Sequence, residues 1–533
     1  MPTLDWIGKK AVINHDKEVP FHLLRCDDKL SVGDPESGNL LVQGDNLVAL
    51  KALLTHYAGQ VKCIYIDPPY NTGNENWTYN DAVNSPEMRD WLGKVVGHEA
   101  EDLSRHDKWL CMMYPRLCLL RQFLRDDGAI FVSIDDTEFY TLRAVMAEVF
   151  GEVNFLCTFI WQHSVQPKGY SGTVSVHHNY VVAFRRSQKF VFNDLKRREE
   201  HNVHYSNPDK DPRGPWRSGD VRNALYRPNL IYDLVTPSGK IIKPPPKGWR
   251  WSKATMYRKI EDGEIVFRSN EERIVRKIYL ADQTGRPAES IFFAEDVGTT
   301  REANQELKNI FSGSVPFDTP KPVALIRRIL QIGADPDSIV MDSFAGSGTT
   351  GHAVLEANKE DGGTRRFVLV ELDEQICKTV TAPRLSKAVL GGSQTKANGG
   401  MLELPALSGG FRFVTLGEPL FDETGNIRAD VRFADLAAHV FFVETGVPLP
   451  KRKNGRTPLL GAHNGVAIYL LFNGILGDKT PQGGNVLTRA VRDVLPPHDG
   501  PKVVYGTSCR IGPERLRREN ITFRQIPYEV KVH

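Results

Sequence analysis

Four consecutive residues, Asp67-Pro68-Pro69-Tyr70, combine groups that could act on an amino group. Two successive prolines fix the backbone and remove two N–H donors, which leaves their carbonyl oxygens free to accept beside one carboxylate and one ring. The exocyclic amino group of a nucleobase is a poor nucleophile because its lone pair is delocalised, and it gains positive charge as it attacks a methyl group. The Asp67 carboxylate and the Pro68 carbonyl could accept its two hydrogens and stabilise that charge.

The aromatic ring of Tyr70 could stack on the base that carries this amino group. A base inside a duplex is out of reach, so it would first have to be flipped out of the helix. Taken alone, the tetrapeptide could also be a rigid turn on the protein surface.

A second motif, Gly346-Ser347-Gly348-Thr349-Thr350-Gly351, has the spacing GxGxxG, and Glu371 follows twenty positions later. This pattern fits a dinucleotide fingerprint. Glycines let a backbone approach a ligand closely, a helix N-terminus offers N–H groups to an anion, and an acidic side chain can hold ribose hydroxyls. Any adenosine-bearing ligand with a negatively charged end would fit. A tight turn that binds nothing is the alternative, and the absence of GK[ST] argues against a nucleotide triphosphatase.

Two blocks of alternating strands and helices are expected to position these motifs. In the first block a strand at 40–42 leads through Gly44 into a helix that Asp45 or Asn46 would cap. A buried strand at 63–66 ends directly at Asp67. The block continues with a helix within 107–125 closed by Asp127-Gly128, a strand at 129–134, a helix at 142–149 stopped by Gly151, and strands at 156–161 and 180–184.

The second block has a strand at 338–342, the glycine turn at 344–351, a helix at 351–358 and a strand at 366–371. Strands that alternate with helices predict an α/β fold with a parallel sheet covered on both faces. Because Asp67 follows its strand directly, we expect it at the carboxyl edge of this sheet, where α/β proteins form their ligand sites.

With both motifs in place, the chain resembles the DNA amino-methyltransferases of the permuted class, in which the catalytic motif precedes the cofactor motif. The resemblance is closest to the modification subunits of type III restriction systems. It rests on four motifs in the family's order, which are Leu41–Leu47, Tyr65–Gly73, Thr319–Pro322 and Asp342–Thr350. It implies a Rossmann-like fold of S-adenosylmethionine-dependent methyltransferases with circularly permuted motif order, S-adenosylmethionine as methyl donor, and no metal.

The same resemblance implies a role for each matching residue. Phe344 packs on the adenine of the cofactor, Gly346 and Gly348 line its methionine half, Glu371 holds its ribose hydroxyls, and Asp45 meets its adenine amino group. The segment with Thr319, Lys321 and Pro322 closes over the cofactor, and the motifs add Asn46, Asp342 and Thr349 as cofactor-binding residues. In this family Asp-Pro-Pro-Tyr accompanies mostly adenine N6, whereas cytosine-N4 enzymes more often carry Ser first, so adenine is predicted.

Residues 163–300 are rich in Arg, Lys, Pro, Gly and aromatic residues and lie where this class keeps its target-recognition region. Basic side chains could neutralise phosphates, and tryptophans could stack or wedge at a flipped base. The candidate DNA contacts are Arg185, Arg186, Lys196, Arg197, Arg198, Trp216, Trp249 and Trp251. For each charge the alternative is a solvated surface residue, and for each tryptophan it is the core of a small domain.

The predicted organisation is therefore a catalytic half at 1–162, an inserted recognition region at 163–300, a cofactor-binding half at 301–395 and a C-terminal domain at 400–533. The last is expected to be a small α/β unit. In type III modification subunits such regions serve dimerisation and contact with the restriction subunit. The resemblance thus implies duplex DNA, a second copy and a restriction subunit as partners.

The bulk composition sets wider limits on this interpretation. A chain of 533 residues predicts two or three domains, and 25% charged with 41% hydrophobic residues is ordinary for a soluble protein. A net charge of +3 neither demands nor excludes nucleic acid. We expect no signal peptide and no membrane span, hence a cytoplasmic protein. Seven scattered cysteines without a CxxC pair argue for reduced thiols rather than structural zinc.

Other functions remain open at this point. A cytosine-N4 methyltransferase or a solitary methyltransferase is the alternative within the same family. A nicotinamide-dependent oxidoreductase could use the same glycine turn, although it leaves the double proline and the Arg-rich segment unexplained. A non-catalytic DNA-binding module that keeps this fold is a further alternative.

Overall fold

The computed structural model describes residues 4–72, 93–94, 104–167, 174–268, 270–395, 401–450, 457–472, 475–477 and 484–526. Gly73, the last residue of one family motif, lies outside them. The chain forms two compact units, the larger made of Met1–Val191 and Glu289–His533 and the smaller of Phe192–Ala288. The smaller unit falls within the segment 163–300 in which the sequence predicts an insertion.

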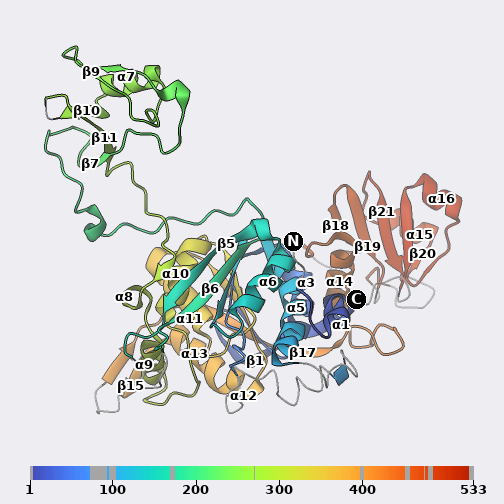
Figure 1. Ribbon diagram of the computed structural model, residues 1–533. Helices are drawn as coiled ribbons and strands as arrows, with labels where there is room; N and C mark the ends of the chain where they lie inside the picture. Colours follow the sequence, from blue (N-terminus) through green and yellow to red (C-terminus); the bar gives the residue numbers. More distant parts are fainter. Residues whose placement is uncertain are drawn as a thin grey trace. The chain divides into compact units, whose positions relative to one another are not determined.

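A ten-stranded sheet forms the centre of the larger unit, in the order β1-β17-β2-β14-β13-β3-β4-β6-β5-β12 (Figure 1). Its middle is parallel, as predicted, and consists of β2 (Leu40–Gln43), β14 (Arg366–Glu371), β13 (Ile339–Asp342), β3 (Val61–Ile66) and β4 (Leu124–Ile134). All residues of β3 and β13 are buried. Such continuous apolar runs are typical of strands covered on both faces.

The two flanks of the sheet are mixed, which differs from the purely parallel sheet that was predicted. On one side β6 (His178–Arg185) runs antiparallel to both β4 and β5 (Phe155–Gln162), and β12 (Ile291–Phe292) pairs with β5. On the other side β17 (Gly410–Pro419) runs parallel to β2 and antiparallel to β1 (His22–Gly33). Strand β17 lies in the segment predicted as a C-terminal domain, yet it pairs inside the central sheet.

Helices cover both faces of this sheet (Figure 1). On one face α3 (Asn46–Tyr57), α5 (Arg105–Phe123) and α6 (Phe139–Phe150) pack together and share a core with Ile64 and Ile66 of β3. The other face carries α10 (Val323–Gly333), α11 (Thr349–Asp361) and α13 (Ala382–Leu390). Asp45 caps α3 by accepting from Val48 N at 3.0 Å, as the sequence predicts. The predicted stop at Asp127-Gly128 is wrong, because α5 ends at Phe123 and these residues belong to β4.

Shorter elements complete the larger unit around its sheet. They are α1 (Lys9–Val12), α2 (His15–Glu18), α8 (Ala294–Val297), α9 (Thr300–Ile310), α12 (Glu374–Ile376), β15 (Gly392–Thr395) and β16 (Met401–Leu404).

The smaller unit has a three-stranded sheet of β10 (Ile265–Arg268), β11 (Arg273–Tyr279) and β7 (Trp216–Gly219). A short hairpin of β8 (Leu234–Val235) and β9 (Ile241–Ile242) and the helix α7 (Lys253–Glu261) accompany this sheet. Its core consists of Val221, Leu234, Trp249, Met256 and Ile265. The unit thus has an apolar interior of its own.

The C-terminal part folds around a four-stranded sheet of β18 (Leu459–His463), β19 (Val466–Leu470), β21 (Lys502–Gly506) and β23 (Ile521–Gln525). The helices α14 (Phe433–Thr445), α15 (Arg489–Val494) and α16 (Pro513–Arg518) and the strands β20 (Val486–Leu487) and β22 (Ser508–Cys509) accompany it. This part thus combines a sheet with helices, as expected of a small α/β unit. Within the described residues, no helix is both long and apolar enough to cross a membrane.

Strand β17 belongs to the C-terminal part and pairs inside the ten-stranded sheet. We therefore expect the C-terminal part and this sheet to unfold together. Phe413 in β17 is fully buried, so Phe413→Ala should lower the free energy of unfolding by about 3–5 kcal/mol. The neighbouring Arg412 is exposed, and Arg412→Ala should change it by less than about 1 kcal/mol. Chemical denaturation measures both. Equal, small effects would show that β17 is not part of the folded sheet.

Candidate active site

The sheet changes its winding direction between β13 and β3. From β3 the chain continues to β4 on one side, and from β13 it continues to β14 on the other side. Such a switch point leaves a crevice at the carboxyl ends of the two strands, which is where open α/β sheets bind ligands. Asp67 follows β3 directly and Asp342 ends β13, so both predicted motifs meet at this crevice.

The Asp67 side chain lies at the base of this crevice, 17% exposed, and forms an ion pair with the ammonium group of Lys321 through Oδ2. The Lys321 nitrogen also lies 5.1 Å from the centre of the Tyr70 ring. Asp67 Oδ1 and the Tyr70 hydroxyl are buried and have no hydrogen-bond partner among the described residues. One carboxylate oxygen is thus fixed by a cation, while the other is left to accept from another group.

The two proline carbonyls differ in their surroundings. The Pro69 oxygen accepts a hydrogen bond of 2.7 Å from the indole Nε1 of Trp109 in α5. This corrects the expectation that both proline carbonyls are free, because the Pro69 carbonyl is used to hold the loop. The expected role of the Pro68 carbonyl as a substrate acceptor stays a prediction.

Burial keeps the Tyr70 phenol neutral. Desolvation, and secondarily the nearby Asp67 carboxylate, raise the pKa of Tyr70 well above its ordinary value. The ring therefore offers an uncharged aromatic surface next to the acidic group, as a stacking role requires.

The glycine turn lies opposite, between β13 and α11. Gly346 and Gly348 have φ angles of 52° and 79°, a left-handed region that side chains with a Cβ rarely adopt. The Gly346 N–H donates to Oε2 of Glu371 at 2.7 Å, and the Asp373 N–H donates to Oε1 at 2.9 Å. The buried Glu371 carboxylate therefore ties the turn to the end of β14.

Asp342 fixes the start of the same turn. Its Oδ1 accepts from Phe344 N at 3.0 Å, and its Oδ2 lies 2.5 Å from the hydroxyl of Thr350. Burial raises the pKa of Asp342 to about 7, with a smaller contribution in the same direction from Asp67. Both carboxyl oxygens of Asp342 are thus engaged by groups of the protein.

Thr349 joins the turn to the segment that carries Lys321. Its hydroxyl donates to the Lys321 carbonyl at 3.2 Å and accepts from Arg384 Nη1 at 2.9 Å. Arg384 also donates to the Ser347 hydroxyl at 3.0 Å. Burial lowers the pKa of Arg384 to about 10. Pro322 caps the adjoining α10, and Thr319 has a left-handed φ of 50°.

The predicted pair Asp45-Asn46 approaches the turn from the first block. Asn46 Nδ2 donates to the Ser343 carbonyl at 3.3 Å, while Arg116 donates to Asn46 Oδ1 at 2.5 Å and lies 3.5 Å from Asp45 Oδ2. The structure therefore brings Asp45 and Asn46 to the start of the glycine turn. Arg116 and Arg384 were not predicted as site residues. Both are buried, but α5 and α13 carry other cations as well, so the sequence does not set these two apart.

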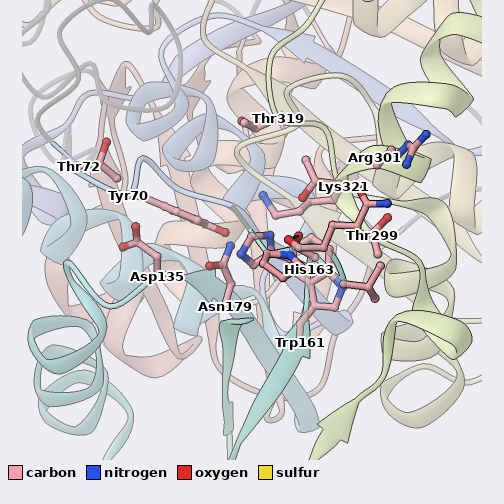
Figure 2. Close-up of a pocket in the computed structure, with 15 residues that line it drawn as sticks. Tyr70, Thr72, Asp135, Trp161, His163, Asn179, Thr299, Arg301, Thr319 and Lys321 are labelled. Carbon is pink, nitrogen blue, oxygen red and sulfur yellow. Dashed lines mark hydrogen bonds between the residues drawn. The ribbon is translucent and has the colours of Figure 1, made fainter. Parts of the chain in front are cut away.

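A cavity of about 560 Å³ opens beside Tyr70 and Lys321 (Figure 2). Asp135, Trp161, His163 and Asn179 line it as well and were not predicted. These four lie at the end of β4, the end of β5 and the start of β6, which meet at one sheet edge because β6 is antiparallel. In the sequence, these cavity residues could have been found only as polar residues at the ends of predicted strands.

A second pocket of about 20 Å³ lies on the other side of Lys321, and Asp67, Asp342, Phe344, Gly346 and Thr349 line it. Thr319 and Lys321 border both spaces. The narrow pocket is bounded by Phe317, whose ring packs over Gly346. Thr319 and Lys321 thus border both a larger and a smaller space, and Asp67 lines the smaller one.

The predicted DNA contacts are divided between the two units. Arg185 ends β6 and Arg186 follows it in the larger unit, whereas Lys196, Arg197 and Arg198 begin the smaller unit. Trp216 and Trp249 are 3% and 2% exposed, and their Nε1 atoms donate at 2.8 Å to Asp209 and to the Tyr232 carbonyl. Neither ring is open to a base, which corrects the prediction that these two tryptophans contact DNA.

Trp251 is half-buried, with three cations, Arg250, Lys259 and Arg276, near its ring. Leu225 and Tyr226, each 64% exposed, are among the exposed apolar side chains of this unit and lie between Arg222 and Arg227. No group of three His, Cys, Asp or Glu side chains in the described part of the chain could hold a metal ion.

Comparison with known proteins identifies the family. A family model described as DNA methylase, of the N6/N4 type, matches residues 61–382. The matched residues include the Asp67–Tyr70 loop, the residues that line the cavity and the glycine turn. The chain belongs to the DNA methylase family.

Individual relatives of this DNA methylase are restriction-modification proteins. The chain is 32% identical to the StyLTI Mod subunit of Salmonella typhimurium, over 72% of this chain and 60% of that protein. It is 30% identical to the EcoP15I Mod subunit of Escherichia coli, over 70% and 64%. The type II methyltransferase M.KpnI of Klebsiella pneumoniae is 31% identical, over 66% and 84%. The chain spans less than two thirds of the length of the two type III relatives.

The buried Asp342 of this DNA methylase predicts a pH dependence of stability. A carboxyl group with a pKa of about 7 in the folded state stays protonated there, whereas in the unfolded chain it ionises near its model value of 3.8. Its contribution to the free energy of unfolding is therefore present below about pH 4 and is lost as the pH rises to about 7.

The variant Asp342→Asn isolates this contribution, because an amide of the same shape cannot ionise. Denaturation between pH 4 and 7 should show that the wild-type protein loses stability relative to Asp342→Asn as the pH rises. Parallel curves for the two proteins would show that Asp342 is ionised in the folded protein.

Proposed function

We propose that this DNA methylase transfers a methyl group from S-adenosylmethionine to N6 of adenine in double-stranded DNA. The observation that carries the proposal is the meeting of the Asp67–Tyr70 loop and the Gly346–Gly351 turn at one switch point of the sheet. An acceptor for an amino group and a glycine cradle for an adenosine ligand are thereby adjacent. Membership of the DNA methylase family supports both assignments.

The residues of the narrow pocket fit the proposed cofactor. Phe344 offers a ring and Gly346 a backbone without a Cβ. The Glu371 carboxylate at the end of the neighbouring strand does not line the pocket but accepts from the Gly346 N–H behind it. A Cβ on Gly346 would lie 2.9 Å from the Phe317 ring, so the space there exists only for glycine. Phe317 would have to move to admit a nucleoside. When bound, S-adenosylmethionine would supply a methyl group already activated on a sulfonium.

Tyr70 and Lys321 line the larger cavity, and with the neighbouring Asp67 and Pro68 they fit a flipped base. Tyr70 would stack on the base, and Asp67 Oδ1 and the Pro68 carbonyl would accept the two amino hydrogens as positive charge develops on the nitrogen. The Lys321 ammonium holds Oδ2 of the same carboxylate and so fixes its orientation. One oxygen of Asp67 thus holds the carboxylate in place, while the other can accept a hydrogen bond from the base.

The smaller unit supports duplex DNA as the substrate. It carries 20 Lys and Arg against 13 Asp and Glu, a net charge of +7, while the whole chain carries +3. The rest of the chain is therefore net negative, and the excess of positive charge lies in the segment proposed for target recognition. Such a concentration attracts phosphates. Flipping of the target base and the base sequence that is read are parts of this proposal.

The type III relatives suggest a role as the modification subunit of a restriction-modification system. On that proposal the partners are DNA, a second copy of the chain and a restriction subunit, and the protein acts in the cytoplasm. The second candidate is a methyltransferase that acts without a bound restriction subunit. It is favoured because the match to M.KpnI covers 84% of the length of that type II methyltransferase.

Removal of the Asp67 carboxylate tests the chemistry. Asp67→Ala should lower methyl transfer to duplex DNA by at least about 1,000-fold, because the amino group loses its charged acceptor. Isothermal calorimetry should still detect S-adenosylmethionine binding and no NAD binding. Glu423→Ala, an exposed residue beyond the catalytic sheet, serves as the control and should keep full activity. Full activity in Asp67→Ala would refute the mechanism.

The methylated base can be read directly from cells that express the protein. Methylation-aware sequencing of their DNA should show N6-methyladenine at one short recurrent sequence, and none in cells that express Asp67→Ala. N4-methylcytosine at the recurrent sequence would reassign the substrate while leaving the amino-group mechanism in place. Unmodified DNA together with an inactive purified protein would favour a non-catalytic DNA-binding role.

A further inference from the structure

The Asp67–Tyr70 segment is called the catalytic loop here. Beside it lies one buried carboxylate that has no part in the proposed chemistry. Glu138 lies between β4 and α6, and its side chain is fully buried. A carboxylate without solvent is costly unless hydrogen bonds satisfy its oxygens. The groups that satisfy Glu138 therefore indicate what this charge does.

Three segments of the chain converge on this carboxylate. Oε1 of Glu138 accepts from Asn71 Nδ2 at 2.5 Å and lies 2.7 Å from Nδ1 of His106, in the first turn of α5. Oε2 accepts from the Thr141 hydroxyl of α6. Asn71 directly follows Tyr70, so Glu138 connects the catalytic loop to the helices on either side.

The loop needs such a connection because Asn71 has a left-handed backbone. Its φ of 59° is unfavourable for a residue with a side chain, and Asn is among the residues that tolerate it best. The Asn71 amide also donates to the Arg105 carbonyl at 3.1 Å, and its side chain is almost completely buried. Hydrogen bonds from two directions thus hold this conformation.

The other side of Tyr70 is held from the same helix. Pro69 accepts from Trp109 of α5, one turn after Arg105 and His106. Tyr70 therefore lies between two residues whose positions are set by α5, and Glu138 adds the link to α6. Placement of this kind matters because catalytic groups need to be held to within about 0.5 Å of their productive geometry.

We propose that Glu138 is a positioning residue for methyl transfer. Through Asn71 it fixes the backbone that directs Tyr70 and Asp67 toward the target base. This inference rests on the proposed function, since it concerns the same site. Glu138 does not touch the reacting atoms, so its loss should lower kcat and leave the binding of cofactor at the glycine turn intact.

A purely structural role for Glu138 makes a different prediction. Its carbonyl accepts from Leu142 N at 2.8 Å at the start of α6, and its carboxylate accepts from Thr141 of that helix. If Glu138 only stabilised the start of α6, its removal would lower the melting temperature. Its effect on kcat would then be independent of the effect of Asn71→Gly. The two roles are separable by kinetics.

A double-mutant cycle in kcat tests the proposal. Asn71→Gly keeps a residue that accepts the left-handed backbone but removes the amide, and Glu138→Ala removes the carboxylate. Each should lower kcat by about 10- to 100-fold with KM for S-adenosylmethionine changed less than about 3-fold. The double variant should be no slower than the slower single variant, because both remove one interaction. Glu138→Gln retains an oxygen for Asn71 and should restore most of the rate.

The control is Thr488→Ala, which removes the N-cap of α15 in the C-terminal part, where the Thr488 hydroxyl accepts from Val491 N. It should lower the melting temperature and leave kcat unchanged. Losses in the two single variants that multiply in the double variant would overturn the proposal, as would an unchanged kcat in Glu138→Ala. If Glu138→Ala does not fold, Glu138→Asp, whose side chain is one methylene shorter, replaces it in the cycle. An inactive wild-type protein would instead refute the proposed function.

Discussion

The pairing of β3 with β13 is the constraint on which the rest of the structure depends. Met341 lies opposite Ile64 and Val340 opposite Cys63, in strands that are about 275 residues apart in the chain. Because both strands are parallel and buried, this register places their carboxyl ends together. The Asp67 loop and the glycine turn are short extensions of those ends. Everything that the site does follows from this one long-range contact.

Around this contact the protein places several charges where water is excluded. The Asp67–Lys321 pair, Glu371, Arg116, Arg384 and Glu138 are all substantially buried. Buried charges add little to stability compared with apolar side chains of equal size, so their value lies in what they orient. Here each of them fixes a turn, a loop or another charged group at the crevice. The interior near the site is thus organised by hydrogen bonds and ion pairs.

Much of the local structure follows from the sequence. The strands before Asp67 and before Phe344, the Asp45 cap and the stop of α6 at Gly151 have the predicted places, because buried strands, caps and glycine stops leave short-range signals. The two motifs could be located for the same reason. Their shared crevice could be expected only from the rule for parallel sheets.

Long-range features were not predictable in this way. Nothing local in residues 410–419 indicates that β17 pairs with β2, and a buried arginine such as Arg384 resembles a surface residue in a single sequence. Trp216 and Trp249 show the same difficulty, since an aromatic residue among cations is as consistent with a core as with a DNA contact. The Pro69 carbonyl is bound for a reason that only tertiary structure shows, the approach of Trp109.

The central claim is that one crevice holds both the methyl donor and the amino-group acceptor. A crystal structure with bound S-adenosylmethionine tests it most directly. The account predicts the adenosine between Phe344 and Glu371, with the methyl carbon directed toward Asp67 so that a base nitrogen between them could approach it to about 3–3.5 Å. Binding of the adenosine at another site, or a methyl group directed away from Asp67, would contradict the account.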